Sequence, residues 1–386
     1  MNHTSRVTKL TLLMLAFGTI AFFWNPLKLL SQSAGKSFAP ATEWRATHAR
    51  AGDQYVGNRA CAECHTQTET QPSTPMGKAL ELGEECRILK ANPKLTFKSG
   101  VYSYSISRQG SQSIYSVTDG KATMSVPILY AFGQGKAGQT YVLVHNGKYY
   151  ESRVSFYDEI AGLDYTLGAP RQPANSLEEA FGRIMDSLDT KDCFSCHATA
   201  AVSERTLQVE KMTPGITCEG CHGAGEKHVT RMKSKMPAAQ SANKAILNPG
   251  HFDNEGMTQF CGSCHRTWEQ VQMMKNARGV VNVRFQPYRI FSSKCYDFDD
   301  KRISCTACHN PHEASTQEAA FYDTKCAACH RTAPATNAGR TAPLCKNGKT
   351  NNCVSCHMPQ YEIPGAHHKF TDHRIRIVKA GEAYID

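Results

Sequence analysis

The clearest hydrophobic pattern in the chain begins near residue 93, where polar positions alternate with β-branched or aromatic ones. The stretch LTFKSGVYSYSISRQGSQSIYSVTDGKATMSVPILYAF is interrupted by glycines at 100, 110 and 120. Alternation with a period of two is typical of half-buried strands, and glycine marks the turns between them. Further on, YVLVHNGKYYESRV holds Asn146–Gly147, the pair that type I′ hairpin turns favour. We therefore expect five or six antiparallel strands over about 93–157, in an insertion that spans 93–165.

A helical pattern follows this insertion. The stretch NSLEEAFGRIMDSLDT, residues 175–190, predicts an amphipathic helix with Asn175 or Ser176 as its N-cap. Over all 386 residues the mean hydropathy is only −0.45. The aliphatic core is thin for this length, so we expect something other than leucine and valine to fill the interior.

The first 33 residues have the pattern of an export signal. A basic start, MNHTSRVTK, precedes the apolar run Leu10–Trp24, and SQSAG offers a cleavage point near Ser33–Ala34. The run is shorter than the roughly 20 residues that span a bilayer. Because PLKLL prolongs its apolar character, an uncleaved anchor through residues 10–30 is the alternative. Either reading predicts export to the periplasm or the cell surface.

The chain has 17 cysteines and 16 histidines, far more than an ordinary enzyme of this length. Fourteen of the cysteines fall into one pattern, C-x-x-C-H, which occurs seven times. The seven copies, numbered below as motifs 1 to 7, are Cys61, Cys64 and His65; Cys193, Cys196 and His197; Cys218, Cys221 and His222; Cys261, Cys264 and His265; Cys305, Cys308 and His309; Cys326, Cys329 and His330; and Cys353, Cys356 and His357.

This pattern is the attachment signal of c-type haem. The two thiols form thioethers with the two vinyl groups of one haem, and the adjacent histidine becomes the proximal ligand of the iron. Zinc ribbons would pair C-x-x-C units in twos, and neither zinc nor disulfides would require a histidine after every unit. The sequence therefore predicts seven covalently attached haem c groups.

Three cysteines lie outside the motifs: Cys86, Cys295 and Cys345. Because export favours disulfides, we predict a Cys295–Cys345 bond, which leaves Cys86 without a role. Six motifs crowd into residues 193–357, so the porphyrins would form the core. The expected fold class is a multihaem cytochrome c fold, mainly short helices and loops packed on haems, with an antiparallel β insertion and little regular secondary structure. The expected divisions are 1–33 signal or anchor, 34–92 first haem segment, 93–165 β insertion, 166–377 six-haem domain and 378–386 tail.

Each haem iron has a second axial position, which decides between an electron carrier and a catalyst. His312 follows His309 by three residues and His228 follows His222 by six. A residue spans at most about 3.5 Å, so neither histidine can reach the far face of its own haem, and each should serve a neighbouring one. Our first-choice distal ligands are His228, His312, His368 and His373, and further candidates are His145, His251 and Met76. His48 ranks below these, and His367 is the spare member of its pair.

The formal charge of +10 does not indicate nucleic-acid binding. Three of the positive charges, Arg6, Lys9 and Lys28, lie in the export segment, and no basic run reaches five residues. Haem propionates would offset much of the remainder. The chain shows no constellation for hydrolysis and no phosphate-binding glycine loop after a strand, so we assign no catalytic residue. The partners we expect are redox proteins, a donor and an acceptor.

The motifs resemble those of exported multihaem cytochromes with a cytochrome c-552/c-554-type domain. The resemblance covers roughly residues 55–377, and two motifs are similar to those of the wider group of hydroxylamine oxidoreductase and the multihaem nitrite reductases. The stretches that carry it are YVGNRACAECH, TPM, EEAFGRIMDSLDTKDCFSCH, ITCEGCHGAGEKHV, SKCY, CTACHNPHE and CVSCHMP with HKFTDHRI.

The resemblance implies mostly bis-histidine haems in closely packed parallel and perpendicular pairs that transfer electrons. It also implies distal roles for His228, His312, His368 and His373. The chain departs from the nitrite reductases because it has no C-x-x-C-K motif. We expect an electron-transfer protein; the alternatives are an oxidoreductase acting on a small nitrogen or sulfur species at one five-coordinate haem, and an extracellular polymer.

Overall fold

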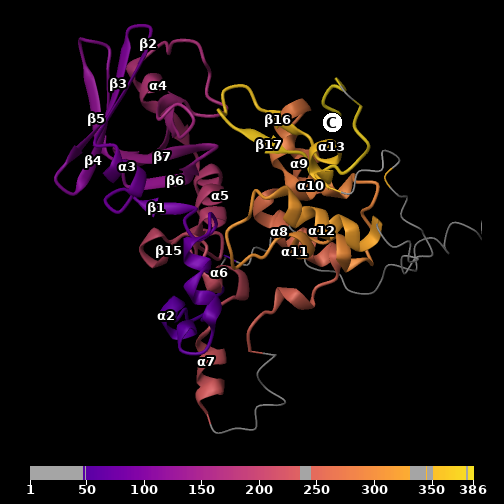
Figure 1. Cartoon of the computed structure of the whole chain (residues 1–386). Helices are drawn as coiled ribbons and strands as arrows, with labels where there is room; N and C mark the ends of the chain where they lie inside the picture. Colours follow the sequence, from indigo (N-terminus) through magenta and orange to yellow (C-terminus); the bar gives the residue numbers. More distant parts are fainter. Residues whose placement is uncertain (1–46, 48, 235–244, 331–344, 346–350, 380) are drawn as a thin grey trace, which may run out of the picture. The chain divides into compact units, whose positions relative to one another are not determined.

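The protein is described by a computed structural model, which covers residue 47 and residues 49–234, 245–330, 345, 351–379 and 381–386. Its most regular part is a four-stranded antiparallel sheet in the order β2-β3-β4-β5 (Figure 1). Tyr102, Tyr104 and Ile106 of β3 point to the buried face, as the alternating pattern predicts. Its strands are β2 Lys94–Ser99, β3 Tyr102–Gln109, β4 Gln112–Thr118 and β5 Thr123–Pro127.

A second antiparallel sheet has seven strands, with β1-β6-β7-β8-β11 in order and β9 and β10 joined through β7. The turn between β7 and β8 holds Asn146 and Gly147, whose φ values of 49° and 73° are those of a type I′ turn. That predicted hairpin is confirmed. The strands are β1 Leu80–Leu82, β6 Tyr130–Gly135, β7 Gly138–His145, β8 Lys148–Ser152, β9 Val154–Tyr157, β10 Gly162–Tyr165 and β11 Gly182–Met185.

The two sheets share a core of their own. Tyr115, Leu143 and Phe181 are fully buried in one apolar cluster that draws on both sheets. Cys86 lies in the same cluster and donates its thiol hydrogen to Gln139 Oε1 at 3.2 Å. Cys86 is therefore a core residue of the β region.

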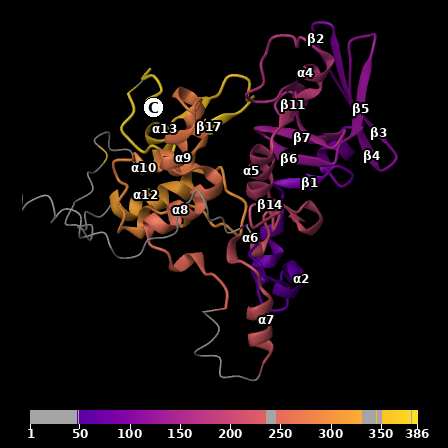
Figure 2. The same cartoon turned by 180° about the vertical axis from the view of Figure 1, so that it is seen from behind.

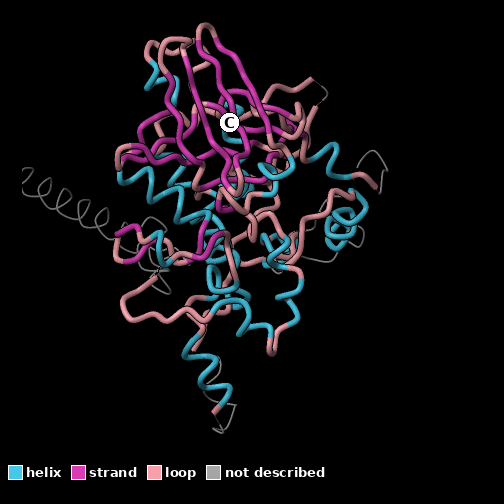
Figure 3. The backbone as a smooth tube through the Cα atoms, turned by 90° about the vertical axis from the view of Figure 1, so that its left-hand side faces the viewer, coloured by secondary structure: helices cyan, strands magenta, loops and turns pink. Residues whose placement is uncertain are grey.

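The expected fold class underestimates the amount of regular β structure and is wrong. Instead of short helices with little regular structure, the chain contains a large antiparallel β core together with helices (Figure 3). The region 93–157 holds eight strands, β2 to β9, rather than five or six. The physical reason is that its aromatic and β-branched residues bury one another, so this part of the chain needs no porphyrin to fill its interior.

The predicted helix over 175–190 is also wrong in extent. Ser176 does cap a helix, since its hydroxyl accepts from Glu179 N, but that helix, α4, spans only Leu177–Phe181. At Gly182 the chain enters β11 (Figure 2), which pairs with β8. A Cβ at Gly182 would collide with the backbone carbonyl of Glu151, so only glycine permits this close approach.

The remaining regular structure consists of helices. Seven of them carry the C-x-x-C-H motifs: α2 Gly57–Ala62, α5 Ser187–His197, α6 Cys218–His222, α8 Asn254–His265, α11 Cys305–Cys308, α12 Ala319–His330 and α13 Cys353–His357. The other α-helices are α3 Arg87–Ala91, α7 Glu226–Lys233, α9 Trp268–Met273 and α10 Gln286–Phe291. Single turns of 3₁₀-helix are η1 Thr66–Glu69, η2 Gln71–Ser73, η3 Val209–Lys211, η5 Pro249–His251, η6 Gly279–Arg284 and η7 Lys301–Ile303.

Three two-stranded antiparallel sheets lie among these helices: β12 Ala198–Thr199 with β15 Thr213–Pro214, β13 Val202–Ser203 with β14 Thr206–Leu207, and β16 Gln360–Glu362 with β17 Lys369–Thr371. The apolar clusters among residues 268–384 are small. One comprises Val271, Ala277, Phe285 and Tyr288, and the other comprises Val283, Ile363 and Ala366. The helical region thus lacks the extended apolar core that the sheets have.

Within the described ranges, no helix is long and apolar enough to cross a membrane. The predicted signal or anchor, residues 1–33, lies outside the described residues. Cys295 and Cys345 are both exposed and are not bonded to each other, so the structure does not contain the predicted disulfide.

Candidate haem sites

The attachment residues lie at helix ends. In α5, α6, α8, α12 and α13 the motif histidine is the last helical residue. On a helix, positions i, i+3 and i+4 lie on one face, so both thiols and the histidine of a motif point the same way. This local geometry suits a group that is bonded through two thioethers and one axial nitrogen.

Hydrogen bonds fix the tautomer of three proximal histidines. Nδ1 donates to a backbone carbonyl in His197 (Ala79 O), His222 (Leu247 O) and His357 (Arg376 O), at 2.9 Å in each case. Because a carbonyl can only accept, Nδ1 carries the proton and Nε2 is left free as a base. A hydrogen bond from the ring nitrogen that does not face the metal is the usual support of a metal-binding imidazole.

Three motif histidines each face a histidine from another segment. The ring centroids of His65 and His228 lie 6.3 Å apart, and those of His222 and His312 lie 6.1 Å apart. A third pair, His309 and His373, has a separation of 6.2 Å. Two imidazoles that bind one metal ion from opposite sides, each about 2 Å from it, have centroids about 6 Å apart. All three pairs therefore fit a bis-histidine haem iron.

The third pair is the most deeply enclosed. His373 donates from Nδ1 to Thr371 O at 3.0 Å, and the Ser293 hydroxyl holds the backbone that follows, donating to His373 O and accepting from Ile375 N. Burial lowers the pKa of His373 to about 4 and also lowers that of His309. Both rings are thus neutral at pH 7, which is the form that binds a metal.

The other predicted distal ligands lie in different settings. The His368 ring packs edge-on against Phe370, with centroids 4.9 Å apart. His145 ends β7, where its ring contacts Tyr150 and Phe181. The structure places the remaining two in turns: the ring of His251 lies 3.3 Å from the Asn248 amide, and Met76 precedes β1. His48 lies outside the described residues.

His367, which the sequence left as a spare, has a structural partner. Its Nε2 lies 2.8 Å from Asp164 Oδ2, and its ring packs on Tyr157 with centroids 4.8 Å apart. Arg171 binds the same carboxylate at 2.6 Å. His367 therefore ties the C-terminal segment to β10 through a hydrogen bond.

The motifs are arranged in pairs. The first cysteines lie side by side in motifs 1 and 3, in motifs 4 and 5, and in motifs 6 and 7: Cys61 with Cys218, Cys261 with Cys305, and Cys326 with Cys353. Burial raises the pKa of the Cys61 and Cys221 thiols to about 11. Attachment sites that lie far apart in the sequence are thus adjacent and partly enclosed.

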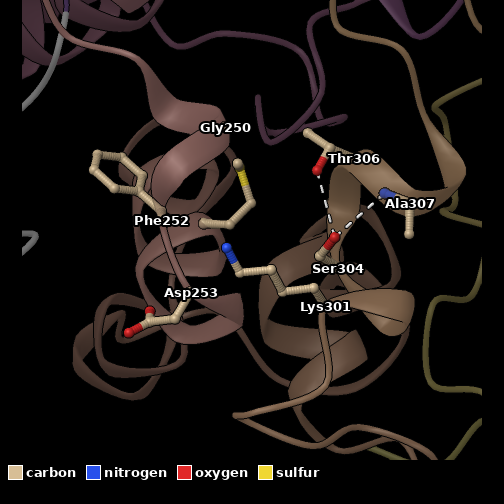
Figure 4. A pocket seen from close by; sticks show the side chains of 8 residues that line it. Gly250, Phe252, Asp253, Lys301, Ser304, Thr306 and Ala307 are labelled. Carbon is tan, nitrogen blue, oxygen red and sulfur yellow. Dashed lines mark hydrogen bonds between the residues drawn. The ribbon is translucent and has the colours of Figure 1, made fainter. Parts of the chain in front are cut away.

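A cavity of about 170 Å³ opens beside motifs 4 and 5 (Figure 4). Met257, whose sulfur accepts from the Cys261 thiol at 3.9 Å, forms one wall together with Phe252. Lys301 extends across the cavity toward this apolar wall (Figure 4). Asp253, Ser304 and Thr306 also line the cavity, and its volume is too small for a porphyrin, so we assign no haem to it.

Two buried carboxylates beside the motifs escaped the sequence analysis. Glu219 is the second residue of motif 3, and Asp323 precedes motif 6 by three residues. Both accept backbone N–H groups from a neighbouring motif segment. The inner residues of C-x-x-C-H carry no required chemistry, so the one available signal was an acid beside a cysteine, which is not specific.

Comparison with known proteins agrees with this geometry over part of the chain. Residues 169–223 match the family described as "Cytochrome c554 and c-prime", in a segment that contains motifs 2 and 3. No match was found among curated proteins or solved structures. The resemblance to the hydroxylamine oxidoreductase group stays a prediction. The family match supports a c-type cytochrome domain in this chain, with covalently bound haem c and a role consistent with electron transfer.

Proposed function

We propose that this chain is an exported seven-haem c-type cytochrome that carries electrons through closely packed, mostly bis-histidine haems. The observation that carries the proposal is the set of three histidine pairs, each with ring centroids 6.1 to 6.3 Å apart. In each pair one member is a motif histidine and the other comes from a different part of the chain. Ordinary packing gives no reason for this combination to occur three times.

The residues divide into three roles. The fourteen motif cysteines form the thioethers, the seven motif histidines bind the irons from the proximal side, and His228, His312 and His373 bind from the distal side at motifs 1, 3 and 5. When bound, haem c supplies a one-electron couple between ferric and ferrous iron. Because two imidazoles fill the axial positions, these sites exclude small molecules and favour outer-sphere transfer. His368, His145, His251 and Met76 remain candidate ligands for the other four motifs.

The distal ligands also give an order to the sites. His228 lies six residues after the proximal His222 and pairs with His65, so a short peptide joins sites 1 and 3. His312 lies three residues after the proximal His309 and pairs with His222, so sites 3 and 5 are joined in the same way. Such short links hold neighbouring macrocycles close together. The proposed route therefore runs through sites 1, 3 and 5.

Export and partners belong to the same proposal. The basic and apolar pattern of residues 1–33 directs the chain to the periplasm or the cell surface, where haem c is attached, and residues 10–30 would form the anchor if the signal is retained. Electrons would enter and leave through a donor and an acceptor protein. The distribution of charge gives no reason to include nucleic acid.

The test is haem stoichiometry together with the spin state of the iron. Intact mass spectrometry and a pyridine haemochrome assay of the exported protein should give seven haems per chain, and four or fewer would overturn the proposal. EPR of the oxidised protein should show low-spin signals throughout. A high-spin signal that shifts on addition of nitrite would instead identify a reductase.

A further inference from the structure

Glu219 is a buried carboxylate between two of the attachment motifs. Its side chain belongs to motif 3 and is only 2 % exposed. Oε1 accepts from Val56 N at 2.9 Å and from Gly225 N at 2.8 Å, and Oε2 accepts from Gly57 N at 2.8 Å. All three partners are donors, which suits the ionised carboxylate because that form only accepts. Among the described residues Glu219 forms no ion pair with a lysine or arginine.

The three amides belong to the segments that hold site 1. Val56 and Gly57 stand at the start of α2, which leads into Cys61 and His65. Gly225 directly precedes α7, which carries His228, the partner of the His65 ring. One carboxylate of motif 3 thus fixes the start of the proximal segment and the start of the distal segment of site 1.

Asp323 repeats this arrangement at the other end of the chain. It precedes motif 6 on α12 and is 7 % exposed. Oδ2 accepts from Asn352 N at 2.5 Å and Oδ1 accepts from Cys353 N at 2.7 Å, at the start of the helix of motif 7. In both places the first cysteines of the two motifs also lie side by side. A carboxylate that clamps the neighbouring motif is therefore a repeated device of this chain.

We propose that Glu219 is a positioning residue for site 1, and that its buried charge lowers the reduction potentials of the haems at sites 1 and 3. This inference rests on the proposed function. A negative charge in a low-dielectric interior stabilises the ferric state, which carries one more positive charge than the ferrous state. Net charge, hydrogen bonding and burial are the means by which a protein sets a haem potential.

The test compares Glu219→Gln with Glu63→Gln in the full-length, haem-loaded protein. Glu63 lies in motif 1, its side chain is 53 % exposed, and it pairs with Lys233 at 2.8 Å, so water already screens its charge. In a spectroelectrochemical titration, Glu219→Gln should move two of the midpoint potentials upward, and Glu63→Gln should leave all of them close to wild type. Unchanged potentials in Glu219→Gln, or equal shifts in both variants, would overturn the electrostatic role.

Positioning is tested separately with Glu219→Asp, which keeps the charge but shortens the side chain. Hydrogen exchange at Val56, Gly57 and Gly225 should accelerate in this variant, and the low-spin EPR signal of site 1 should broaden or shift. Unchanged exchange and an unchanged signal would sink the positioning role. If Glu219→Gln does not fold, Glu219→Asp decides the positioning role, and the electrostatic role is decided by the same titration on Glu219→Met, which also removes the charge and keeps a side chain of similar length.

The wild-type protein separates this inference from the proposed function. If it lacks bis-histidine low-spin signals, the proposed function itself fails. If it shows them and the Glu219 variants behave like wild type, only the inference about Glu219 fails.

Discussion

The imidazole rings of His222 and His312 lie almost parallel, with 7° between their planes and 6.1 Å between their centroids. The first belongs to motif 3 and the second follows motif 5. The distance leaves room for one metal ion between two ring nitrogens but is too long for direct stacking. One metal ion between these two rings would thus be bound by residues of two attachment segments, those of motif 3 and motif 5.

Replacement of His312 by alanine should therefore remove one distal ligand. We expect the EPR spectrum of the oxidised variant to lose one low-spin component and gain a high-spin signal, with the haem count unchanged at seven. The matched control is His367→Gln, since the His367 ring is bonded to Asp164 and packs on Tyr157 rather than facing a motif histidine. If both variants keep the full low-spin spectrum, the pairing of His312 with the haem of motif 3 is wrong.

The ion pair of Asp164 should make the stability of the protein depend on pH. Burial alone would raise the pKa of Asp164, but hydrogen bonds from His367, the Tyr165 amide and Arg171 outweigh it and lower the pKa. A lowered folded-state pKa means that the carboxylate stabilises the fold above the usual value of about 3.9 and loses this effect as pH falls through the folded-state value.

Asp164→Asn should accordingly lower the free energy of unfolding by about 1 kcal/mol at pH 7, a modest value because the Arg171 side chain is 52 % exposed. Denaturant titrations at several pH values would measure this, and the difference from wild type should shrink below about pH 3.9. Glu84→Gln, at an exposed position of the same region, serves as the control. A difference that stays constant down to pH 2 would contradict the assignment.

The local features of the fold were predictable from the sequence. The hairpin at Asn146–Gly147 forms as expected because its turn conformation depends on two residues alone. The alternation around Tyr104 and Ile106 likewise predicts the buried face of β3, because successive side chains of a strand point to opposite faces. The attachment motifs are equally local, since two thiols and a histidine within five residues already define the chemistry.

Non-local pairing could not be predicted in the same way. The helix expected over 175–190 is interrupted because Gly182 pairs with Ser152, thirty residues earlier, and no helical pattern contains that information. The low mean hydropathy suggested that haems fill the whole interior. The sheets nevertheless have an apolar core, in which valine, leucine and isoleucine pack with five tyrosines whose rings contribute although hydropathy scales count them as polar.

The candidate site shows the same division. His228 and His312 follow a motif histidine too closely to bind the far face of that motif's haem. Their spacing does not show which neighbouring haem each one binds, because that depends on contacts such as the one between His65 and His228, 163 residues apart in the sequence. His367 and His368 are adjacent in the sequence, so only the contact with Asp164 identifies His367 as structural.

A substitution at Cys86 tests whether this cysteine belongs to the apolar core of the sheets and has no part in haem attachment. Because it is fully buried and bonded to Gln139, Cys86→Ala should cost about 1 to 2 kcal/mol of unfolding free energy through lost packing and one lost hydrogen bond. Intact mass should still show seven haems. The exposed Cys345 offers the control, since Cys345→Ala should change neither quantity. Loss of a haem from the Cys86 variant would contradict its assignment to the β core.

The strongest stability effect should come from Arg289 and Asp372, which form a buried bidentate ion pair at 2.8 and 3.0 Å with both side chains at most 1 % exposed. Asp372 directly precedes His373, the distal partner of His309. Arg289→Met removes one of the positive charges that neutralise the buried Asp372 carboxylate. The charge of Arg376, which contacts this carboxylate at 2.9 Å, remains. We expect a loss of about 3 kcal/mol in unfolding free energy.

The same substitution should disturb the low-spin EPR signal of the haem at motif 5, since the backbone that positions His373 is anchored by this ion pair. Arg302→Met is the matched control, because Arg302 pairs with Asp300 at 2.6 Å but is 40 % exposed, and such pairs contribute at most about 1 kcal/mol. Denaturant unfolding and EPR on both variants decide the matter. Equal losses of stability in the two variants, or an unaltered EPR spectrum in Arg289→Met, would show that the buried pair does not support His373.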